Sequence, residues 1–504
     1  MASFFQYPPS LSEEDGLHIA AHIQDWQINH GSMLKDIRSQ SAQSVLCYPI
    51  GVSVFPTPFP KAQFDKALRL QSIYHELYCA LAEDEQWIFD TIKDLISVHP
   101  LAAALWDIHK RIKSSGGYCQ GLSAGIFRSD YMLHVEGDPT EDKPDLGLRQ
   151  VEFNTFSCAG ASHADKVADM HHHLARTGVY AFDDSPISIT CLPRNNNINN
   201  VAACLAEAHT AYGPPKSKVA KQTVVLFVVQ PRNFNIADER PIEYALWDRD
   251  VPIPAYRVDF AEDVLQYTSL TESRELLFHP PWRGRQPPVE VSVVYMRAGY
   301  EAQEYNETGV EARLRLEMSR AIKCPSLLAH ILTFKKVQQR LTTPGALERV
   351  LSAEKAAVIR STFVQIYPMD ESERGMYARS LALDAHSARD YILKPSLEGG
   401  GNNIYGEDIP PFLAKIHPSS WGAFVLMERI ASPRVDNVLM SPQGISLGGV
   451  VSELGVIGGC LWRTGEILSS SVAGWSFKTK FEEVDEMSVV KGYGCFDTPL
   501  LFEQ

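Results

Sequence analysis

The segment Lys394-Pro395-Ser396-Leu397-Glu398-Gly399-Gly400-Gly401-Asn402-Asn403 decides how the rest of this chain is interpreted. It follows a short apolar run at 391–393 that is typical of the end of a strand. Successive glycines let backbone N–H groups wrap an anion, whereas a lysine neutralises phosphate charge and a carboxylate can hold Mg²⁺. Glycine runs also occur in loops that merely turn the chain. The flanking lysine and asparagines favour a phosphate-binding loop over a plain turn.

Composition limits the class of protein. The chain has 504 residues, 45% apolar and 21% charged, which is ordinary for a globular protein with two or three subdomains. Its net charge of −14 argues against a general nucleic-acid binder. We find neither an apolar run of about 18–20 residues nor a signal peptide. Nine scattered cysteines without a C-x-x-C pair indicate reduced thiols, so we expect a cytoplasmic enzyme.

Hydrophobic periodicity predicts an α/β fold. Residues 62–98 have apolar side chains at helical spacing, and 149–154 alternate like a half-buried strand. Residues 223–229 form a continuous β-branched run that is typical of a buried parallel strand. With further strands near 253–260 and 289–296, this region reads as a small α/β domain.

The strand at 149–154 places two oxygen-bearing side chains on one face. Glu152 and Asn154 alternate with Val151 and Phe153, so the first two face one side and the other two face the opposite side. Glu152 and Asn154 can ligate one Mg²⁺, with Glu398 as a third ligand and phosphate oxygens completing the shell. The alternative is that they form only the solvated face of a strand.

Cations at three separate places match the needs of a nucleotide in an acidic protein. They are Lys335, Lys394 and Lys480, although exposed lysines are mostly solvated surface. Residues 424–430 resemble a strand leading into a hinge whose backbone reads an adenine edge, or equally an ordinary buried strand. Arg128 and Arg297 each stand at the end of an expected element and can bind a carboxylate or form a structural salt bridge.

The run His171-His172-His173 is not a metal site by this reasoning. Consecutive helical residues point about 100° apart, so three in a row cannot converge on one ion. We interpret it as a solvated helix face. The sequence also lacks a nucleophile elbow, a Walker A lysine loop and a Rossmann glycine fingerprint.

Taken together, the motifs resemble the eukaryotic-type glutathione synthetases, which are ATP-grasp ligases. The resemblance covers nearly the whole chain, and its motifs occur in family order. They are Arg128-Ser129-Asp130-Tyr131-Met132, Glu152-Phe153-Asn154-Thr155, Val294-Tyr295-Met296-Arg297, Gly299-Tyr300, Lys323-Cys324-Pro325, Lys335-Lys336-Val337-Gln338-Gln339, Leu393-Lys394-Pro395, Glu398 to Asn403, Tyr405-Gly406-Glu407, Leu426-Met427-Glu428 and Ser452-Glu453-Leu454-Gly455.

The resemblance implies a fold and a reaction. It implies an ATP-grasp core with a lid and an inserted α/β substrate-binding domain, in a homodimer. The expected parts are 1–219, the helical region and first part of the core; 220–325, the inserted domain; and 326–504, the core and lid, with a glycine-rich loop at 398–403 and an acceptor loop at 485–494. The implied reaction phosphorylates the cysteinyl carboxylate of γ-glutamylcysteine with ATP, and the glycine amine then attacks the acyl phosphate.

The resemblance also assigns residues. It implies the magnesium ligands Glu152, Asn154 and Glu398. It implies the ATP contacts Glu152, Lys335, Lys394, Glu398, Gly399, Gly400, Gly401, Asn402, Asn403, Tyr405, Met427, Glu428, Arg429, Ile430, Glu453, Lys480 and Glu486. It implies the substrate contacts Arg128, Ser157, Asn233, Asn235, Glu239, Arg297, Tyr300, Lys478, Val489, Val490 and Lys491. The catalytic residues would be Arg128, Lys335, Lys394 and Lys480.

The substrate half departs from the family pattern. The loop at 157–160 is one residue short and lacks a second serine, and the family's Glu-Arg-Asn…Gln element appears as Asn233-Phe234-Asn235…Glu239. Lys478 replaces an arginine that meets the acceptor carboxylate, so the bidentate fork is lost. In place of the small-residue lid Gly-Gly-Val-Ala-x-Gly stands the bulkier stretch 487–492, which contains Lys491.

Three interpretations follow from these departures. The first is drift in a mobile loop. The second, which we favour, is a ligase whose donor or acceptor differs from the family pair, with Lys491 meeting an extra carboxylate or excluding glycine. The third is a regulatory protein that binds ATP without turnover. A protein kinase is not supported, because no H-R-D or D-F-G element is present.

Overall fold

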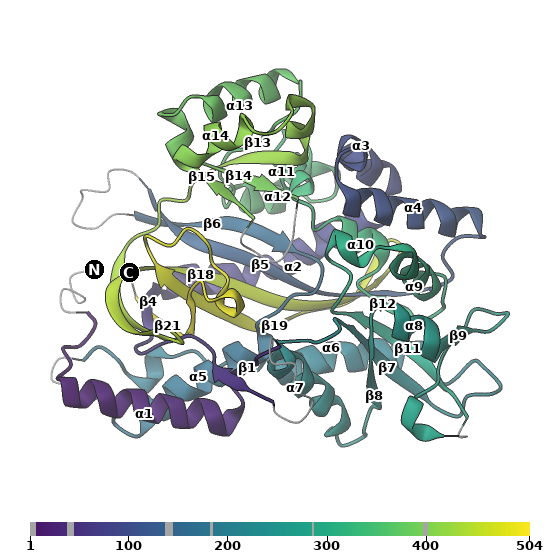
Figure 1. Ribbon diagram of the computed structural model, residues 1–504, viewed down its shortest axis with the longest axis horizontal. Coiled ribbons are helices and arrows are strands. Elements are labelled where there is room, and N and C mark those ends of the chain that lie inside the picture. Colours follow the sequence, from purple (N-terminus) through teal and green to yellow (C-terminus); the bar gives the residue numbers. More distant parts are fainter. Residues whose placement is uncertain are drawn as a thin grey trace.

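A seven-stranded sheet forms the centre of the molecule (Figure 1). The computed structural model describes residues 7–37, 45–136, 145–181, 185–284, 287–396 and 402–503. In spatial order the central strands are β17 (Val435–Ser441), β3 (Val52–Ser53), β20 (Cys495–Asp497), β19 (Glu466–Phe481), β18 (Gly444–Arg463), β5 (Ser123–Glu136) and β6 (Asp145–Asn154). All neighbours are antiparallel except β20 and β3.

Helices pack on both faces of this sheet. Phe127 and Leu454 point into the apolar cluster that contains α2 (Lys61–Ala82), whereas Ile126 and Ile457 point into the cluster that contains α6 (Asn197–Tyr212). Adjacent residues of a strand face opposite sides, so the two helices lie on opposite faces. The predicted helical region 62–98 is two helices. Asp84 accepts a hydrogen bond from Trp87 N at 2.9 Å and caps the second, α3 (Glu85–Ile96).

A register shift in the β5–β6 hairpin changes the predicted side of the strand on which Val151 lies. Asp130 pairs with Glu152, but Tyr131 pairs with Gln150, so Val151 is an extra residue on β6. Val151 therefore lines the same cavity as Glu152 instead of lying only on the face of Phe153. The residues that connect β5 to β6, 137–144, lie outside the described ranges.

The second sheet has six strands and confirms the predicted parallel strands. Its order is β8 (Ala255–Asp259), β7 (Thr223–Val229), β11 (Val289–Met296), β10 (Leu276–Phe278) and β9 (Thr268–Leu270), with β12 (Ile322–Cys324) also paired to β11. β7 is parallel to both β8 and β11. Every residue of β11 is buried, including Glu290 and Ser292, and its other six residues are apolar, as is typical of a strand covered on both faces. The helices α7 (Ile236–Trp247), α8 (Glu262–Tyr267) and α9 (Glu307–Glu317) belong to this region.

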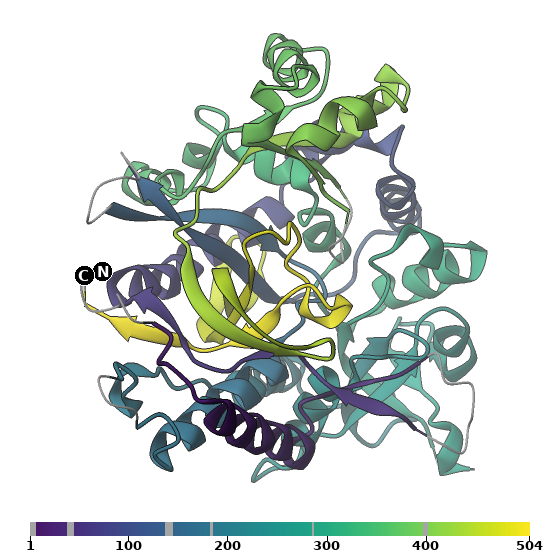
Figure 2. The ribbon, with the colours of Figure 1, turned by 60° about the vertical axis from the view of Figure 1, so that its left-hand side comes forward.

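A four-stranded antiparallel sheet stands apart from the central one, and both views show it, with α13 and α14, on one side of the molecule (Figures 1 and 2). Its order is β13 (Ile366–Pro368), β16 (Phe424–Glu428), β14 (Tyr391–Pro395) and β15 (Ile404–Tyr405). Two short helices lead towards it, α10 (Leu327–Ile331) and α11 (Lys335–Leu341). Phe334, fully buried, stands at the break between them.

The remaining elements complete the chain. Ser12 caps α1 by accepting a hydrogen bond from Asp15 N at 3.1 Å. None of the helices in the described residues has the length and apolar content needed to cross a membrane. The other strands are β1 (Met33–Lys35), β2 (Cys47–Pro49), β4 (Thr57–Pro60) and β21 (Pro499–Phe502). The other helices are α1 (Glu13–His30), α4 (Pro100–Ser114), α5 (Ala161–Arg176), α12 (Ala353–Arg360), α13 (Glu373–Leu383) and α14 (Ile409–Leu413). Short 3₁₀ turns are η1 (Ile189–Cys191), η2 (Pro281–Arg283), η3 (Ala302–Glu304), η4 (Leu347–Arg349), η5 (Ser387–Asp390), η6 (Gly406–Asp408), η7 (Pro418–Ala423) and η8 (Val489–Lys491).

Candidate active site

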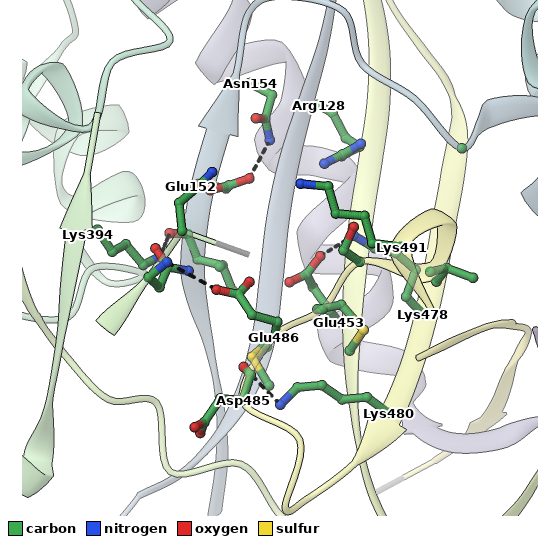
Figure 3. Close-up of a pocket in the computed structure, with 18 of the residues that line it drawn as sticks. Arg128, Glu152, Asn154, Lys394, Glu453, Lys478, Lys480, Asp485, Glu486 and Lys491 are labelled. Atoms are coloured by element: carbon green, nitrogen blue, oxygen red, sulfur yellow. Dashed lines mark hydrogen bonds and ion pairs between the residues drawn. The ribbon is translucent and has the colours of Figure 1, made fainter. Parts of the chain in front are cut away.

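A cavity of about 1000 Å³ is lined by strands of the central and four-stranded sheets (Figure 3). Segments that follow β7 and β11 also line it. Every site residue predicted within the described part of the chain lines it. These residues are Arg128, Glu152, Asn154, Ser157, Asn233, Asn235, Glu239, Arg297, Tyr300, Lys335, Lys394, Asn402, Asn403, Tyr405, Met427, Glu428, Arg429, Ile430, Glu453, Lys478, Lys480, Glu486, Val489, Val490 and Lys491. Glu398, Gly399, Gly400 and Gly401 lie outside the described residues.

Glu152 stands among cations. Lys335 Nζ lies 3.1 Å from Glu152 Oε2, and Lys394 reaches the same strand by donating to Val151 O at 3.2 Å. Burial by itself raises the pKa of Glu152, but Lys335, Lys394 and Arg128 outweigh burial and hold that pKa well below its usual range. The carboxylate is therefore ionised at any physiological pH, as a cation ligand must be.

Asn154 adds a second oxygen beside this carboxylate. Its Nδ2 donates to Glu152 Oε1 and to Asp130 Oδ2, both at 3.1 Å, which leaves the amide oxygen for another partner. The described residues contain no group of three or more His, Cys, Asp or Glu placed to hold a metal. One carboxylate and one amide oxygen fit Mg²⁺ bound mainly through phosphate and water, because this ion retains much of its hydration shell.

The loop after β19 is held by Lys480 and contacts the four-stranded sheet region through Glu486. Lys480 Nζ donates to Val484 O and, at 3.2 Å, to Asp485 O, while Asn403 N donates to Glu486 Oε1 at 3.2 Å. Burial lowers the pKa of Lys480, and Asp485 opposes that shift. The loop after β19 thus contacts the last residue of the glycine-rich segment, Asn403.

The predicted hinge is both an internal strand and a wall of the cavity. β16 pairs with β13 and β14, and Met427 packs in a small apolar cluster with Ile366. Beyond the strand, Arg429 N donates to Asp390 O at 2.8 Å, and Ala431 N donates to His134 Nδ1 at 3.1 Å. His134 also lines the cavity and was not predicted from the sequence.

Two ion pairs lie along the floor. Glu453 and Lys478 are register partners on β18 and β19, with Lys478 Nζ 2.5 Å from Glu453 Oε1. Burial raises the pKa of Glu453, and Lys478 opposes this. Arg128 donates to both oxygens of Asp130 at 2.7 Å and to Ala159 O at 2.9 Å. The salt-bridge alternative for Arg128 is thus realised while the residue still lines the cavity.

Arg297 marks another part of the wall. Its guanidinium donates to Cys158 O and lies 3.4 Å from Asp238 Oδ2 and 3.5 Å from Glu239 Oε1. The side chain of Asn233 hydrogen-bonds Glu239. Burial raises the pKa of Glu239, and Arg297 and Arg257 lower it. The two positions that depart from the family element are therefore in direct contact, and together they offer one carboxylate and one amide.

Asp238 is a supporting residue that sequence reasoning missed. It is buried and accepts from Gly160 N at 2.9 Å and Ser162 N at 3.0 Å, at the start of α5. Gly160 has φ of +93°, and a Cβ there would meet the Phe496 ring at 3.1 Å, so glycine is required. Asp238 links this loop to Arg297. The sequence signal that could have identified Asp238 is its position directly before Glu239, near the start of a helix.

The turn at 488–493 is anchored from below. Ser488 and Tyr493 exchange backbone hydrogen bonds at 2.8 and 2.9 Å, and Val489 is 5% exposed within an apolar cluster that includes Phe496. Lys491 is exposed at the tip, and Figure 3 shows its side chain reaching into the cavity on the side of Arg128.

The interpretation of His171–His173 as a solvated face is wrong. His171 and His172 are buried, and their Nε2 atoms lie 3.1 Å from Ser53 O and 3.3 Å from Pro193 O. His173 stacks on Trp26 with ring centroids 5.0 Å apart. The three rings contact different partners. The prediction failed because α5 is enclosed by segments that are distant in sequence.

Asp497 lies beneath the strand that carries Lys478 and Lys480. It accepts from Thr479 Oγ1 at 2.7 Å, from Thr57 Oγ1 at 2.5 Å and from Ser53 Oγ. Burial raises the pKa of its carboxyl from 3.8 to about 6, against these hydrogen bonds. The folded state therefore binds a proton between these values that the unfolded state releases.

This raised pKa predicts a pH dependence of stability. The contribution of Asp497 is fully present below pH 3.8 and is lost as pH rises through about 6. In Asp497→Asn we expect the fall in unfolding free energy between about pH 4.5 and 7.5 to be about 2 kcal/mol smaller than in the wild type. Urea denaturation of both proteins at the two pH values measures it, and equal pH dependences would refute the assignment.

The comparisons with known proteins agree with one another. A family model described as "Eukaryotic glutathione synthase, ATP binding domain" matches residues 13–501. The glutathione synthetase large chain of Schizosaccharomyces pombe is 30% identical over 515 aligned residues, covering 99% of each chain. Glutathione synthetase of Mus musculus is 31% identical over 494, covering 97% of this chain and 98% of the other. The solved structure of a glutathione synthetase-like effector from Globodera pallida, in its apo form, matches with a TM-score of 0.73 and 18% identity over 98% of each chain, which shows the fold alone.

Proposed function

The chain belongs to the eukaryotic glutathione synthetase family and is an ATP-dependent ligase, and we propose that it joins the carboxylate of a γ-glutamyl dipeptide to the amine of an amino acid through an acyl phosphate. The family reaction gives glutathione, ADP and phosphate. The altered substrate residues support a donor or acceptor that differs from γ-glutamylcysteine and glycine.

The chemistry requires activation of the carboxylate. An amine that attacked the carboxylate carbon directly would have to expel oxide, which is a poor leaving group. ATP therefore first transfers its γ-phosphoryl group to a carboxylate oxygen, releasing ADP. The amine then attacks the acyl carbon, and inorganic phosphate leaves with the carbon–oxygen electron pair. Such reactions depend on positioning and on neutralising charge. Lys335, Lys394 and Lys480 meet the phosphates, and Arg128 meets the reacting carboxylate.

We assign the metal to the end of the cavity at β6. Glu152 and Asn154 would hold Mg²⁺, which neutralises phosphate charge, and Glu398 completes the proposed ligands. The low pKa of Glu152 and the amide oxygen of Asn154 support this. Removing Mg²⁺ with EDTA should abolish ADP formation, and added Mg²⁺ should restore it.

The donor is assigned to the wall at Arg297. Arg297 would meet a carboxylate and Glu239 an ammonium group, with Ser157, Asn233, Asn235 and Tyr300 around them. Arg297 is buried and lies within 3.5 Å of the carboxylates of Asp238 and Glu239. The site therefore suits the zwitterionic end of an amino acid better than an anion without an ammonium group.

This assignment predicts the effect of neutralising Glu239. In Glu239→Gln we expect the KM for the donor to rise about 10-fold, because a charge-assisted contact to the ammonium is lost. Glu482→Gln, a change of the same kind at an exposed cavity position, is the matched control. Steady-state kinetics with varied donor measures both, and an unchanged donor KM in Glu239→Gln would exclude this role.

The domain division, oligomeric state and cellular location of the protein are also proposed from the family resemblance and the chain's composition. We propose the divisions 1–219, 220–325 and 326–504, and all strands of the six-stranded sheet fall within the middle range. We also propose a homodimer, on the family resemblance, and a cytoplasmic location, which nine free cysteines support. Light scattering tests the dimer, and cell fractionation tests the location.

One observation supports this function best: four cationic side chains from four different elements line the same cavity. They are Arg128 on β5, Lys335 on α11, Lys394 on β14 and Lys480 on β19. The test is ADP release with Mg·ATP, γ-glutamyl dipeptides and a panel of amino acids, with the product identified by mass. Product of donor mass plus acceptor mass minus water is expected. Tight Mg·ATP binding without ADP from any pair would instead favour a regulatory ATP-binding protein.

A further inference from the structure

The turn Met487–Tyr493, called the acceptor turn below, presents a cation to the cavity from a fixed backbone. Lys491 N donates to Ser488 O at 3.0 Å, and Gly492 N donates to Val489 O at 2.9 Å. Together with the Ser488–Tyr493 pair and buried Val489, these bonds hold the tip of the turn in place. An anchored backbone loses less entropy when a long side chain engages a ligand than a glycine-rich loop would.

Lys491 reaches towards a group of charges on the floor of the cavity. Figure 3 shows it directed to the side of Arg128, with Lys478 and Glu453 beneath it. Arg128 is paired with Asp130, and Lys478 with Glu453. Lys491 adds a third cation at the same place, from a different element.

The Lys478–Glu453 pair has the chemistry of an amino-acid receptor. Its two charged groups are 2.5 Å apart and largely buried, with side-chain exposures of 11% and 7%. An ammonium group can bind the carboxylate of Glu453, and an α-carboxylate can bind the ammonium of Lys478, so a zwitterion matches both. A second anionic group on the same ligand could then extend to Lys491.

The triphosphate has a separate set of cations. Lys335 and Lys394 lie against β6, on the other side of Glu152, and Lys480 contacts the loop at 484–485. Figure 3 shows Lys394 and Lys491 approaching the cavity from opposite sides. Lys491 is therefore placed beside the substrate carboxylates.

From this arrangement we propose that the acceptor is an α-amino acid with a second anionic group, a dicarboxylic amino acid, whose α-carboxylate binds Lys478 and whose side-chain carboxylate binds Lys491. The proposal rests on the proposed ligase function. The chemistry is the same. The acceptor ammonium loses a proton, for which the Glu453 carboxylate is the adjacent base, and the amine nitrogen then bonds to the acyl carbon. The bond from that carbon to the phosphate oxygen breaks, phosphate leaves with its electron pair, and the second amine proton passes to solvent.

The first experiment compares acceptors with the wild-type enzyme, Mg·ATP and γ-glutamylcysteine. We expect kcat/KM for aspartate or glutamate to exceed that for glycine about 10- to 100-fold, the range of one charge-assisted contact. Glycine as the best acceptor would overturn the proposal while leaving the ligase function intact. Binding is measured in parallel, as the shift in melting temperature caused by aspartate or glycine with a non-hydrolysable ATP analogue and Mg²⁺. If no pair gives ADP, the ligase function fails, and a larger shift with aspartate still supports the acceptor site.

The second experiment changes the charge of the acceptor turn. In Lys491→Gln the aspartate-to-glycine ratio of kcat/KM should fall about 10- to 100-fold, and in Lys491→Glu the preference should move to lysine or arginine as acceptor. Lys110→Gln, at an exposed helix position outside the cavity, should leave the ratio unchanged. If the Lys491 variants instead raise the KM for ATP equally with every acceptor, Lys491 serves the nucleotide and the proposal is overturned.

Discussion

Glu152→Gln should lower kcat/KM by about 10²–10³-fold, the loss typical of removing one group that stabilises a charged transition state. Glutamine keeps the shape of the side chain but not the charge that lies 3.1 Å from Lys335 and that three cations hold ionised. The assigned Mg²⁺ would lose its only carboxylate ligand on β6. The measurement is ADP release with Mg²⁺ varied at saturating donor and acceptor.

Two features of that measurement distinguish a metal ligand from a structural group. The loss should be partly recovered at high Mg²⁺, because the affinity for the metal and not the fold has changed. Glu482→Gln, which removes the same charge from an exposed cavity position, should stay near wild type. A Glu152→Gln enzyme with normal kcat/KM at low Mg²⁺ would remove this residue from the metal site.

Replacing Glu317 with leucine should destabilise the fold by about 3–5 kcal/mol, because it leaves the charge of Arg313 buried without its carboxylate. Both side chains are fully buried, and Arg313 Nε lies 2.9 Å from Glu317 Oε1. Arg313 also stands 5.6 Å from the ring of Phe156, which lines the cavity. Urea denaturation measures the change in unfolding free energy.

The matched double variant tests the cause. Arg313→Met with Glu317→Leu removes both charges at similar volume and should recover most of the loss, because desolvation of the pair disappears along with its attraction. The exposed pair Arg463–Glu466 is the control, where Glu466→Gln should change stability by at most about 1 kcal/mol. A double variant as unstable as Glu317→Leu would show that packing, and not charge, sets the effect.

Much of the fold could be predicted, because strong local patterns coincide with buried elements. The run at 223–229, and the run at 289–296, which is apolar except for Glu290 and Ser292, are central strands whose residues are nearly all buried. The prediction failed where a neighbour decided the outcome. The helix α2 ends at Ala82 and Asp84 caps the next helix, and His171 and His172 are polar residues enclosed by segments distant in sequence.

The candidate site divides in the same way. The sequence by itself predicted which residues serve the nucleotide, because their motifs follow the order of the family that the chain resembles. Only the tertiary structure decided their partners. Arg128 is held by Asp130, Lys478 by its cross-strand neighbour Glu453, and Asn233 contacts Glu239.

The physical reason is that ion pairing and burial depend on distances between groups that the chain places far apart in sequence. Lys335 and Glu152 are brought within 3.1 Å by the packing of α11 against β6, and Lys491 faces the cavity because Val489 anchors its turn. The sequence gives the type of each side chain. Its protonation state and the ligand it binds depend on the neighbouring groups that folding brings close to it.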